Sequence, residues 1–327
     1  MPPFCIELIT SCFAKIIKES DVMKFYPEGQ NTALQRTFDS LEDIKIAMMN
    51  GSVIESRVLL CDSDHNLHVD LGIIRGIIPR EEGAIGIDDG TTRDIALISK
   101  VNKFVCFTIL GFQRDDFGNT SAILSRKAVQ TGCKINYIDN LVPGDIIDAA
   151  VTHLEKFGAF IDIGAGINAL IPIDMLSVSR INHPRERLYE GEGIRVVLRK
   201  KEPEKLTFSL KELLGTWQEN ANLFEVGQTV TGVVRSVESY GVFVELMPNL
   251  AGLAEPCDFL FEGQTVAVYI KSILPDKMKI KLVVVEAFQE SEPAGELTYF
   301  VCDNHINRFD YSPPNAPKEI TTDFDKD

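Results

Sequence analysis

Residues 157–163 read Phe157-Gly158-Ala159-Phe160-Ile161-Asp162-Ile163, and a matching heptad, Tyr240-Gly241-Val242-Phe243-Val244-Glu245-Leu246, recurs later in the chain. In both heptads two aromatic residues stand three apart, and the β-branched residues beside them favour a pleated, half-buried strand. Because strand side chains alternate between faces, Phe160 and Asp162 are predicted to point one way, and Ile161 and Ile163 the other. A ring on the outward face of a small barrel offers a flat surface on which an unpaired base can stack.

Each heptad sits in a longer repeated frame of five predicted strands with glycine at the corners. The frame begins at Val142-Pro143-Gly144-Asp145 and again at Val226-Gly227-Gln228. After the heptad come a short strand (169–172; 252–255), a second glycine turn (190–193; 262–264) and two closing strands (194–199 and 205–210; 266–272 and 279–284). Five strands in such a short repeat predict a five-stranded Greek-key barrel of the OB type.

A third, more divergent copy of the frame lies upstream. His65 and His68 take the places of the two aromatics, Gly76-Ile77-Ile78-Pro79 matches the short strand, and Ala122–Lys127 matches the closing strand. The middle of this copy, residues 81–118, is longer and richer in acidic residues. The chain is therefore predicted to hold three barrels in series, at residues 50–127, 141–216 and 226–288.

The repeated unit resembles the S1 RNA-binding domain family. The resemblance is carried by Gly144-Asp145, Phe157-Gly158-Ala159-Phe160, His183-Pro184, Glu190-Gly191 and Thr207-Phe208-Ser209-Leu210-Lys211. It implies a mainly β fold of tandem five-stranded OB-fold (S1-type) barrels with short connecting helices. The whole chain looks like a short, Gram-positive-type relative of ribosomal protein S1.

In that family the RNA face centres on the two heptad aromatics, a histidine on the third strand, and an acidic and a basic residue near the final turn. The histidine is absent here, because Pro79, Pro172 and Glu255 occupy its place, and the acid has a counterpart only in Asp276. The resemblance and the neighbouring charges together give an expected RNA-binding set of Phe157, Phe160, Lys205, Arg199, Lys201, Lys156, Tyr240, Phe243, Lys279, His65 and His68. Since Glu245 and Glu255 stand beside the rings of the third barrel, the second barrel is expected to be the principal site.

The net charge of −15 is concentrated at the C-terminal end, where residues 289–327 carry −6, whereas residues 141–216 carry only −1. The second barrel also holds a basic cluster: Arg180, Arg185, Arg187, Arg195, Arg199, Lys200, Lys201 and Lys205. A nearly neutral domain with segregated charge can present a positive groove to a phosphate backbone. The alternative is that these side chains form an ordinary solvated edge.

The segments around the barrels are predicted from helical spacing and turn residues. A helix is expected within 38–49 of the N-terminal extension (1–49), a short helix with a linker at 128–140, and a helix after the second barrel, with linker 217–225, in which Trp217 anchors packing. The tail, 289–327, is predicted to form a hairpin between Glu296–Cys302 and Ile306–Tyr311 and to be loose beyond it. Residues 1–22 are either a helix or lie upstream of a true start at Met23.

Several function classes find no support in the sequence. No apolar run approaches about 18 residues, so no transmembrane helix is expected. The seven scattered cysteines form no CxxC pair and are expected to be reduced thiols in a cytoplasmic protein. Gly164-Ala165-Gly166 lacks the third glycine of a dinucleotide loop and is interpreted as a turn. The acid pairs Asp88-Asp89 and Asp115-Asp116 could bind magnesium but are more typical of turns.

The sequence therefore predicts a binding protein that is not an enzyme and needs no cofactor or metal. The resemblance to the S1 family implies that its partners are single-stranded RNA, held as message in translation, and the 30S ribosomal subunit, with no membrane and no small-molecule substrate. The alternative is a protein-docking scaffold or accessory factor in transcription or RNA decay.

Overall fold

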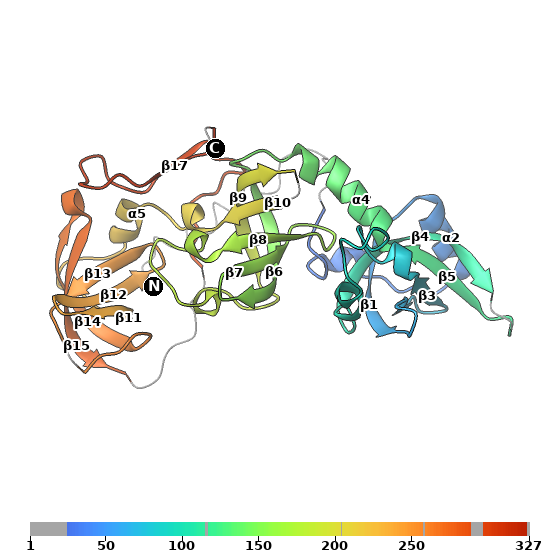
Figure 1. The fold of residues 1–327 in the computed structure, drawn as a ribbon, viewed down its shortest axis with the longest axis horizontal. Helices are drawn as coiled ribbons and strands as arrows, with labels where there is room; N and C mark the ends of the chain where they lie inside the picture. Colours follow the sequence, from blue (N-terminus) through green and yellow to red (C-terminus); the bar gives the residue numbers. More distant parts are fainter. Residues whose placement is uncertain (1–24, 115–116, 204, 258, 289–296, 326–327) are drawn as a thin grey trace.

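The computed structural model describes residues 25–114, 117–203, 205–257, 259–288 and 297–325. They contain three closed five-stranded barrels, which follow one another along the molecule in Figure 1. This confirms the predicted fold class. The predictions for residues 1–22 and for the pair Asp115-Asp116 lie outside the described residues.

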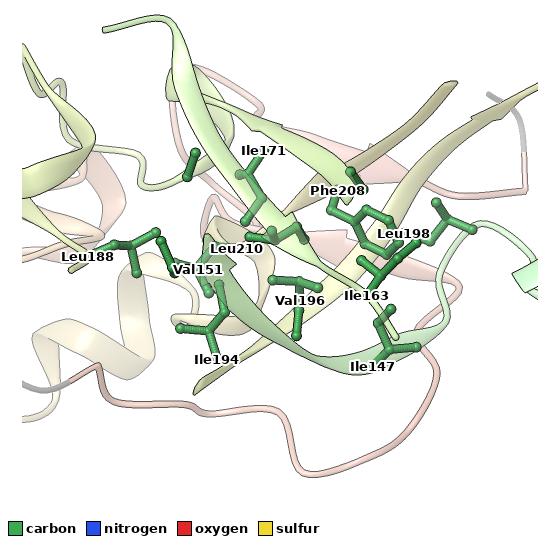
Figure 2. Packing of buried hydrophobic residues seen from close by; sticks show 14 of the residues in the cluster. Ile147, Val151, Ile163, Ile171, Leu188, Ile194, Val196, Leu198, Phe208 and Leu210 are labelled. Carbon is green, nitrogen blue, oxygen red and sulfur yellow. The ribbon is translucent and has the colours of Figure 1, made fainter. Parts of the chain in front are cut away.

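The second barrel occupies the centre of the molecule. Its strands are β6 (Ile146–Glu155), β7 (Gly158–Asp162), β8 (Asn168–Pro172), β9 (Gly193–Glu202) and β10 (Lys205–Ser209), with short 3-10 turns at Ile173–Met175, Pro184–Glu186 and Lys211–Leu213. The strand order is β10-β8-β7-β6-β9, and β10 also runs parallel to β8. Ile161, Ile163, Ile171 and Phe208 are fully buried inside the barrel, where aliphatic side chains from all sides meet (Figure 2).

The other two barrels repeat this topology. The first consists of β1 (Ile54–Cys61), β2 (Leu67–Asp70), β3 (Arg75–Ile78), β4 (Phe104–Arg114) and β5 (Thr120–Ser125), with a 3-10 turn at Arg80–Glu82 and α3 (Ile95–Ile98) in its long middle segment. The third consists of β11 (Thr229–Glu238), β12 (Gly241–Met247), β13 (Leu250–Ala254), β14 (Thr265–Leu274) and β15 (Lys279–Ala287), with a 3-10 turn at Pro275–Lys277. Each first strand carries a register shift at the same place, between Val58 and Leu60, Val151 and His153, and Val234 and Ser236.

Short helices connect the barrels. A 3-10 turn at Thr32–Leu34 precedes α2 (Leu41–Met49), which begins later than predicted because the Ser40 side chain accepts a hydrogen bond from Asp43 N and caps the helix. The linker after the first barrel is α4 (Arg126–Asn136) followed by a 3-10 turn at Ile138–Asn140. The helix after the second barrel, α5 (Trp217–Ala221), is short, and its Trp217 is only 2% exposed, which confirms its predicted role as a packing anchor.

The C-terminal segment differs from its prediction. The predicted hairpin is wrong, because β16 (Arg308–Asp310) pairs instead with β17 (Thr321–Asp323). The segment is also not loose over 297–325: Phe309, Tyr311 and Phe324 are buried in the core shared with the third barrel. Acidic composition suggested a solvated tail, but a few well-placed aromatic residues are enough to dock it.

The cysteine prediction needs one correction. Cys61, Cys106, Cys133 and Cys257 are free, whereas Cys302 is disulfide-bonded. Scattered spacing in the sequence does not show which thiols the fold brings together, so this bond had no sequence signal.

Candidate nucleic-acid interface

Two pairs of aromatic rings lie at equivalent places on the second and third barrels. The rings of Phe157 and Phe160 stand edge to face, with centroids 5.9 Å apart, and those of Tyr240 and Phe243 repeat the arrangement at 6.2 Å. Phe157 is 57% exposed and Tyr240 is 64% exposed, whereas their strand-borne partners are half-buried. Such pairs offer one open ring, held at a fixed angle by a second ring beneath it.

The glycine after the first aromatic has a steric cause. A Cβ on Gly158 would lie 2.3 Å from the carbonyl oxygen of Ile171, and one on Gly241 would lie 2.5 Å from that of Ala254. Glycine therefore lets the neighbouring short strand approach closely, and the first ring is left at the open end of the barrel.

The heptad's predicted alternation holds: Phe160 and Asp162 lie on the outward face, whereas Ile161 and Ile163 are fully buried in the barrel core. Asp162 is nevertheless only 3% exposed, because the segment around Glu28 covers it and the Glu28 backbone N–H donates to its carboxylate. The same carboxylate accepts hydrogen bonds from the backbone N–H groups of Gly164 and Gly166 in the following turn, at 2.8 and 3.0 Å. The same bonds confirm Gly164-Ala165-Gly166 as a turn.

An outward-facing strip crosses three strands in each barrel. In the second barrel Phe160 pairs across the strands with Leu170, which pairs in turn with Thr207. In the third barrel the corresponding residues are Phe243, Leu253 and Lys281. The exposed Lys281 was missed by the sequence reasoning, although its two-residue spacing from Lys279 was a usable signal for a shared face.

Three predicted lysines remain at the rim of these strips. Lys156 is exposed in the turn directly before Phe157, and Lys205 and Lys279 are exposed at the first residue of the closing strand in their barrels. Each closing-strand lysine is two residues before the strip residue of its strand, so it lies on the same outward face. The three lysines therefore border the aromatic rings on the outward face of their barrels.

Arg199 and Lys201 do not belong to this face. The Lys201 Nζ donates to the carbonyl oxygens of Ile138, Asp139 and Leu141, at 3.3, 2.7 and 3.0 Å, and so closes the end of the linker. The Arg199 guanidinium lies over the ring of Phe324, 5.6 Å from its centroid. Both cations serve contacts within the chain, and we omit them from the interface.

Arg187 and Glu245 also have a structural role. The third-barrel acid Glu245 is 6% exposed and accepts hydrogen bonds from Arg187 of the second barrel, at 2.5 Å, and from Arg235, at 2.8 and 3.0 Å. Arg235 also forms an ion pair with Glu186. Glu245 therefore lies in the joint between the two barrels, and its charge does not oppose RNA at the third barrel as the sequence suggested. Glu255, the other acid of that argument, is exposed and pairs with Lys271 at 3.6 Å.

The first barrel lacks these features. His68 takes the place of the inner ring, but its Nε2 lies 2.9 Å from Asp62, and the His65 Nε2 lies 3.8 Å from Asp94. The strip continues through Ile77 to Ile123, so no aromatic ring or lysine stands on it. Both histidines contact aspartates, and we omit them from the interface as well.

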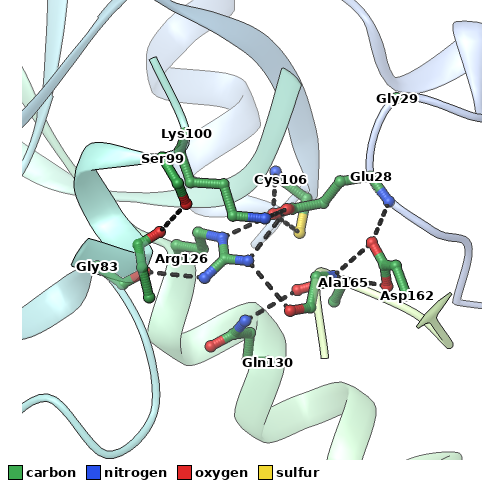
Figure 3. A network of polar contacts seen from close by, with 12 residues as sticks. Glu28, Gly29, Gly83, Ser99, Lys100, Cys106, Arg126, Gln130, Asp162 and Ala165 are labelled. Carbon is green, nitrogen blue, oxygen red and sulfur yellow. Dashed lines mark hydrogen bonds and ion pairs between the residues drawn. The ribbon is translucent and has the colours of Figure 1, made fainter. Parts of the chain in front are cut away.

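The first and second barrels are joined by a buried polar network (Figure 3). Arg126 of α4 donates to both carboxylate oxygens of Glu28, at 2.6 and 3.0 Å, and Lys100 adds an ion pair at 2.8 Å. The Glu28 backbone N–H donates to Asp162 at 2.8 Å. Burial would raise the pKa of Glu28, but the charges of Arg126 and Lys100 outweigh burial and lower it. Burial, and then the Glu28 charge, raises the pKa of Asp162.

The acid pair Asp88-Asp89 is explained by local contacts. Asp88 forms an ion pair with Lys127, and Asp89 accepts hydrogen bonds from the Thr91 N–H and hydroxyl, at 2.9 and 2.7 Å. Among the described residues no group of three His, Cys, Asp or Glu side chains is arranged to hold a metal ion. None of the helices in the described ranges is long and apolar enough to cross a membrane.

Comparison with known proteins agrees with the fold. The family described as "S1 RNA binding domain" matches residues 141–211. The "Small ribosomal subunit protein bS1" of Staphylococcus epidermidis is 33% identical over 316 residues, covering 87% of this chain and 80% of that protein. The Bacillus subtilis homologue is 30% identical (71% of this chain, 63% of that protein), and that of Staphylococcus aureus MRSA252 is 31% identical (58% and 54%). The chain therefore belongs to the small ribosomal subunit protein bS1 family.

Proposed function

We propose that the protein binds single-stranded RNA in translation and holds message near the small ribosomal subunit, through the aromatic faces of its second and third barrels. It acts in the cytoplasm by binding alone, without catalysis. The observation that carries the proposal is the repeated pair of edge-to-face rings, each with its outer member more than half exposed and each bordered by lysines.

The proposed contacts divide into stacking and charge. Phe157, Phe160, Tyr240 and Phe243 stack bases, and each base stacked on an aromatic side chain contributes about 1–3 kcal/mol to binding. Lys156, Lys205, Lys279 and Lys281 neutralise phosphates, and with four such contacts the affinity for a single strand should fall with salt with a log–log slope of about −3. Base stacking and phosphate neutralisation both depend little on the nucleotide sequence, as the binding of varied messages requires.

The third barrel contributes more than its sequence suggested. The argument against it rested on Glu245 and Glu255. The charge of Glu245 is neutralised by two arginines inside the joint, and Glu255 pairs with Lys271. The same joint fixes the third barrel to the second, so a strand bound by one barrel meets the other at a high effective concentration. The first barrel, without rings or lysines on the equivalent strip, is assigned no RNA contact.

The test is fluorescence anisotropy of labelled oligo-U and oligo-A titrated with the full chain at two salt concentrations. We expect Phe157→Ala/Phe160→Ala to weaken binding at least about 10-fold, because two stacking surfaces are lost. Lys281→Ser should weaken binding and flatten the salt dependence, whereas Lys45→Ser, on the exposed face of α2 in the first barrel, serves as the matched charge control. Equal affinity of the double-alanine variant and the unmodified chain would refute the proposed face.

A further inference from the structure

Two exposed aromatic residues outside the heptads occupy the same position in the second and third barrels. Tyr189 is 66% exposed and Phe261 is 60% exposed, and each is preceded by a buried leucine, Leu188 or Leu260. Each stands at the turn that opens the fourth strand of its barrel. In each turn the leucine packs in the core and the aromatic ring after it is exposed to water. The ring therefore makes little contribution to folding.

The two turns have the same hydrogen bonds. The Tyr189 N–H donates to the Glu192 side chain at 3.0 Å, and the Gly191 N–H donates to the Val151 carbonyl at 2.8 Å. In the third barrel the Phe261 N–H donates to the Gln264 side chain at 3.3 Å, and the Gly263 N–H donates to the Val234 carbonyl at 2.8 Å. The backbone at each ring is therefore held in one conformation, which is the preorganisation that a binding surface needs.

The first barrel provides an internal comparison. There Asn102 takes the place of the turn glycine, since its N–H donates to the Val58 carbonyl at 2.9 Å. Two residues earlier, at the position of the ring, stands Lys100, whose Nζ is bound to Glu28 in the joint. The turn aromatic thus occurs in the two barrels that carry heptad rings and is replaced in the barrel that lacks them.

A chain of contacts connects the turn with the heptad rings. On the outward face Phe160 is the cross-strand partner of His153. The His153 Nδ1 lies 3.1 Å from a carboxylate oxygen of Glu190, the residue that follows Tyr189, and its Nε2 lies 2.9 Å from Glu155. The distance from β7 across β6 to the turn is two strand spacings, or about 10 Å. His153 therefore links the turn after Tyr189 to the outward face that carries Phe160.

We propose that Tyr189 is a further stacking platform, which receives a base beyond those held by Phe157 and Phe160, and that Phe261 does the same beside Tyr240 and Phe243. This inference rests on the proposed RNA-binding function. The occupant is a base of the same single strand, because the ring continues the heptad face across His153 in the second barrel and across Ser236, the partner of Phe243, in the third.

The test uses the full chain and labelled oligo-U in the anisotropy assay. Tyr189→Ala should weaken binding about 5-fold or more, the lower end of what one stacked base contributes. Tyr189→Phe should bind as the unmodified chain does, because it keeps the ring, whereas Tyr189→Leu should be as weak as alanine, because it keeps only apolar bulk. Phe261→Ala should give a similar loss.

The matched control is Phe117→Ala. Phe117 is 92% exposed in the turn between β4 and β5 of the first barrel, which is assigned no RNA contact, so its loss should leave affinity unchanged. Circular dichroism checks that each variant is folded. The inference is overturned if Tyr189→Ala and Phe261→Ala bind normally while Phe157→Ala/Phe160→Ala does not. Failure of the unmodified chain to bind any oligonucleotide would instead overturn the proposed function, and the inference with it.

Discussion

Replacing Glu55 by glutamine should stabilise the first barrel at alkaline pH. Glu55 on β1 is 1% exposed, its Oε1 accepts a hydrogen bond from Gly29 N–H at 3.3 Å, and its Oε2 has no hydrogen-bond partner among the described residues. Burial raises the pKa of Glu55 from 4.5 to about 7, and the nearby carboxylates of Glu28 and Asp162 add to the effect. Ionisation of the Glu55 carboxyl group therefore destabilises the folded protein.

The sign and size follow from proton binding. Between pH 4.5 and 7 the folded state keeps the Glu55 proton that the unfolded state has already released, so the free energy of unfolding falls as pH rises through this window. A pKa shift of this size lowers the free energy of unfolding by about 3 kcal/mol at pH 8. Glu55→Gln keeps the shape and the acceptor for Gly29 but cannot ionise. The variant should match the unmodified chain near pH 5 and exceed its stability by about 2–3 kcal/mol at pH 8.

The assay is hydrogen–deuterium exchange of peptides from β1 and β4, compared with the unmodified chain at each pH, because a chain of several domains does not unfold in one step. At pH 8 these amides should exchange about 30-fold more slowly in the variant. Glu42→Gln is the matched control, since Glu42 lies on the surface of α2 with its side chain 73% exposed. A Glu55→Gln effect that stays constant from pH 5 to 8, or a less protected variant at pH 8, would refute the reasoning.

Three further outcomes test the assignments of charged groups. Glu245→Gln leaves two buried arginines undercompensated and should lower stability by about 3–5 kcal/mol, measured by urea unfolding followed through Trp217 fluorescence. Lys201→Met should cost about 1 kcal/mol through the lost carbonyl contacts but leave RNA affinity unchanged, and a loss of affinity would return Lys201 to the interface. The hydrogen bond to Asp145 raises the pKa of His305, so its stabilising effect is present below the ordinary histidine pKa and lost as pH rises through the raised value. His305→Ala should therefore destabilise docking of the C-terminal segment at pH 6 but not at pH 9, seen by exchange of peptides from 303–311.

The sequence by itself determined the repeated architecture and the rings at its centre. Strand alternation and the glycine after the first aromatic act over a few residues, so the heptads predicted where Phe157, Phe160, Tyr240 and Phe243 would stand. The same local rules predicted five strands in each barrel. The turn aromatics Tyr189 and Phe261 were not predicted, because their exposure could be judged only once the turns were built.

The tertiary structure decided which charges are available to a ligand. Arg199, Lys201 and Glu245 look alike in the sequence whether they face solvent or another segment, and their actual partners lie far away along the chain: Phe324, the linker carbonyls and Arg187. The docking of the C-terminal segment was hidden for the same reason. Local pattern fixes the direction of a side chain from its own strand, whereas the pairing of a charge depends on which distant segment the packed fold brings beside it.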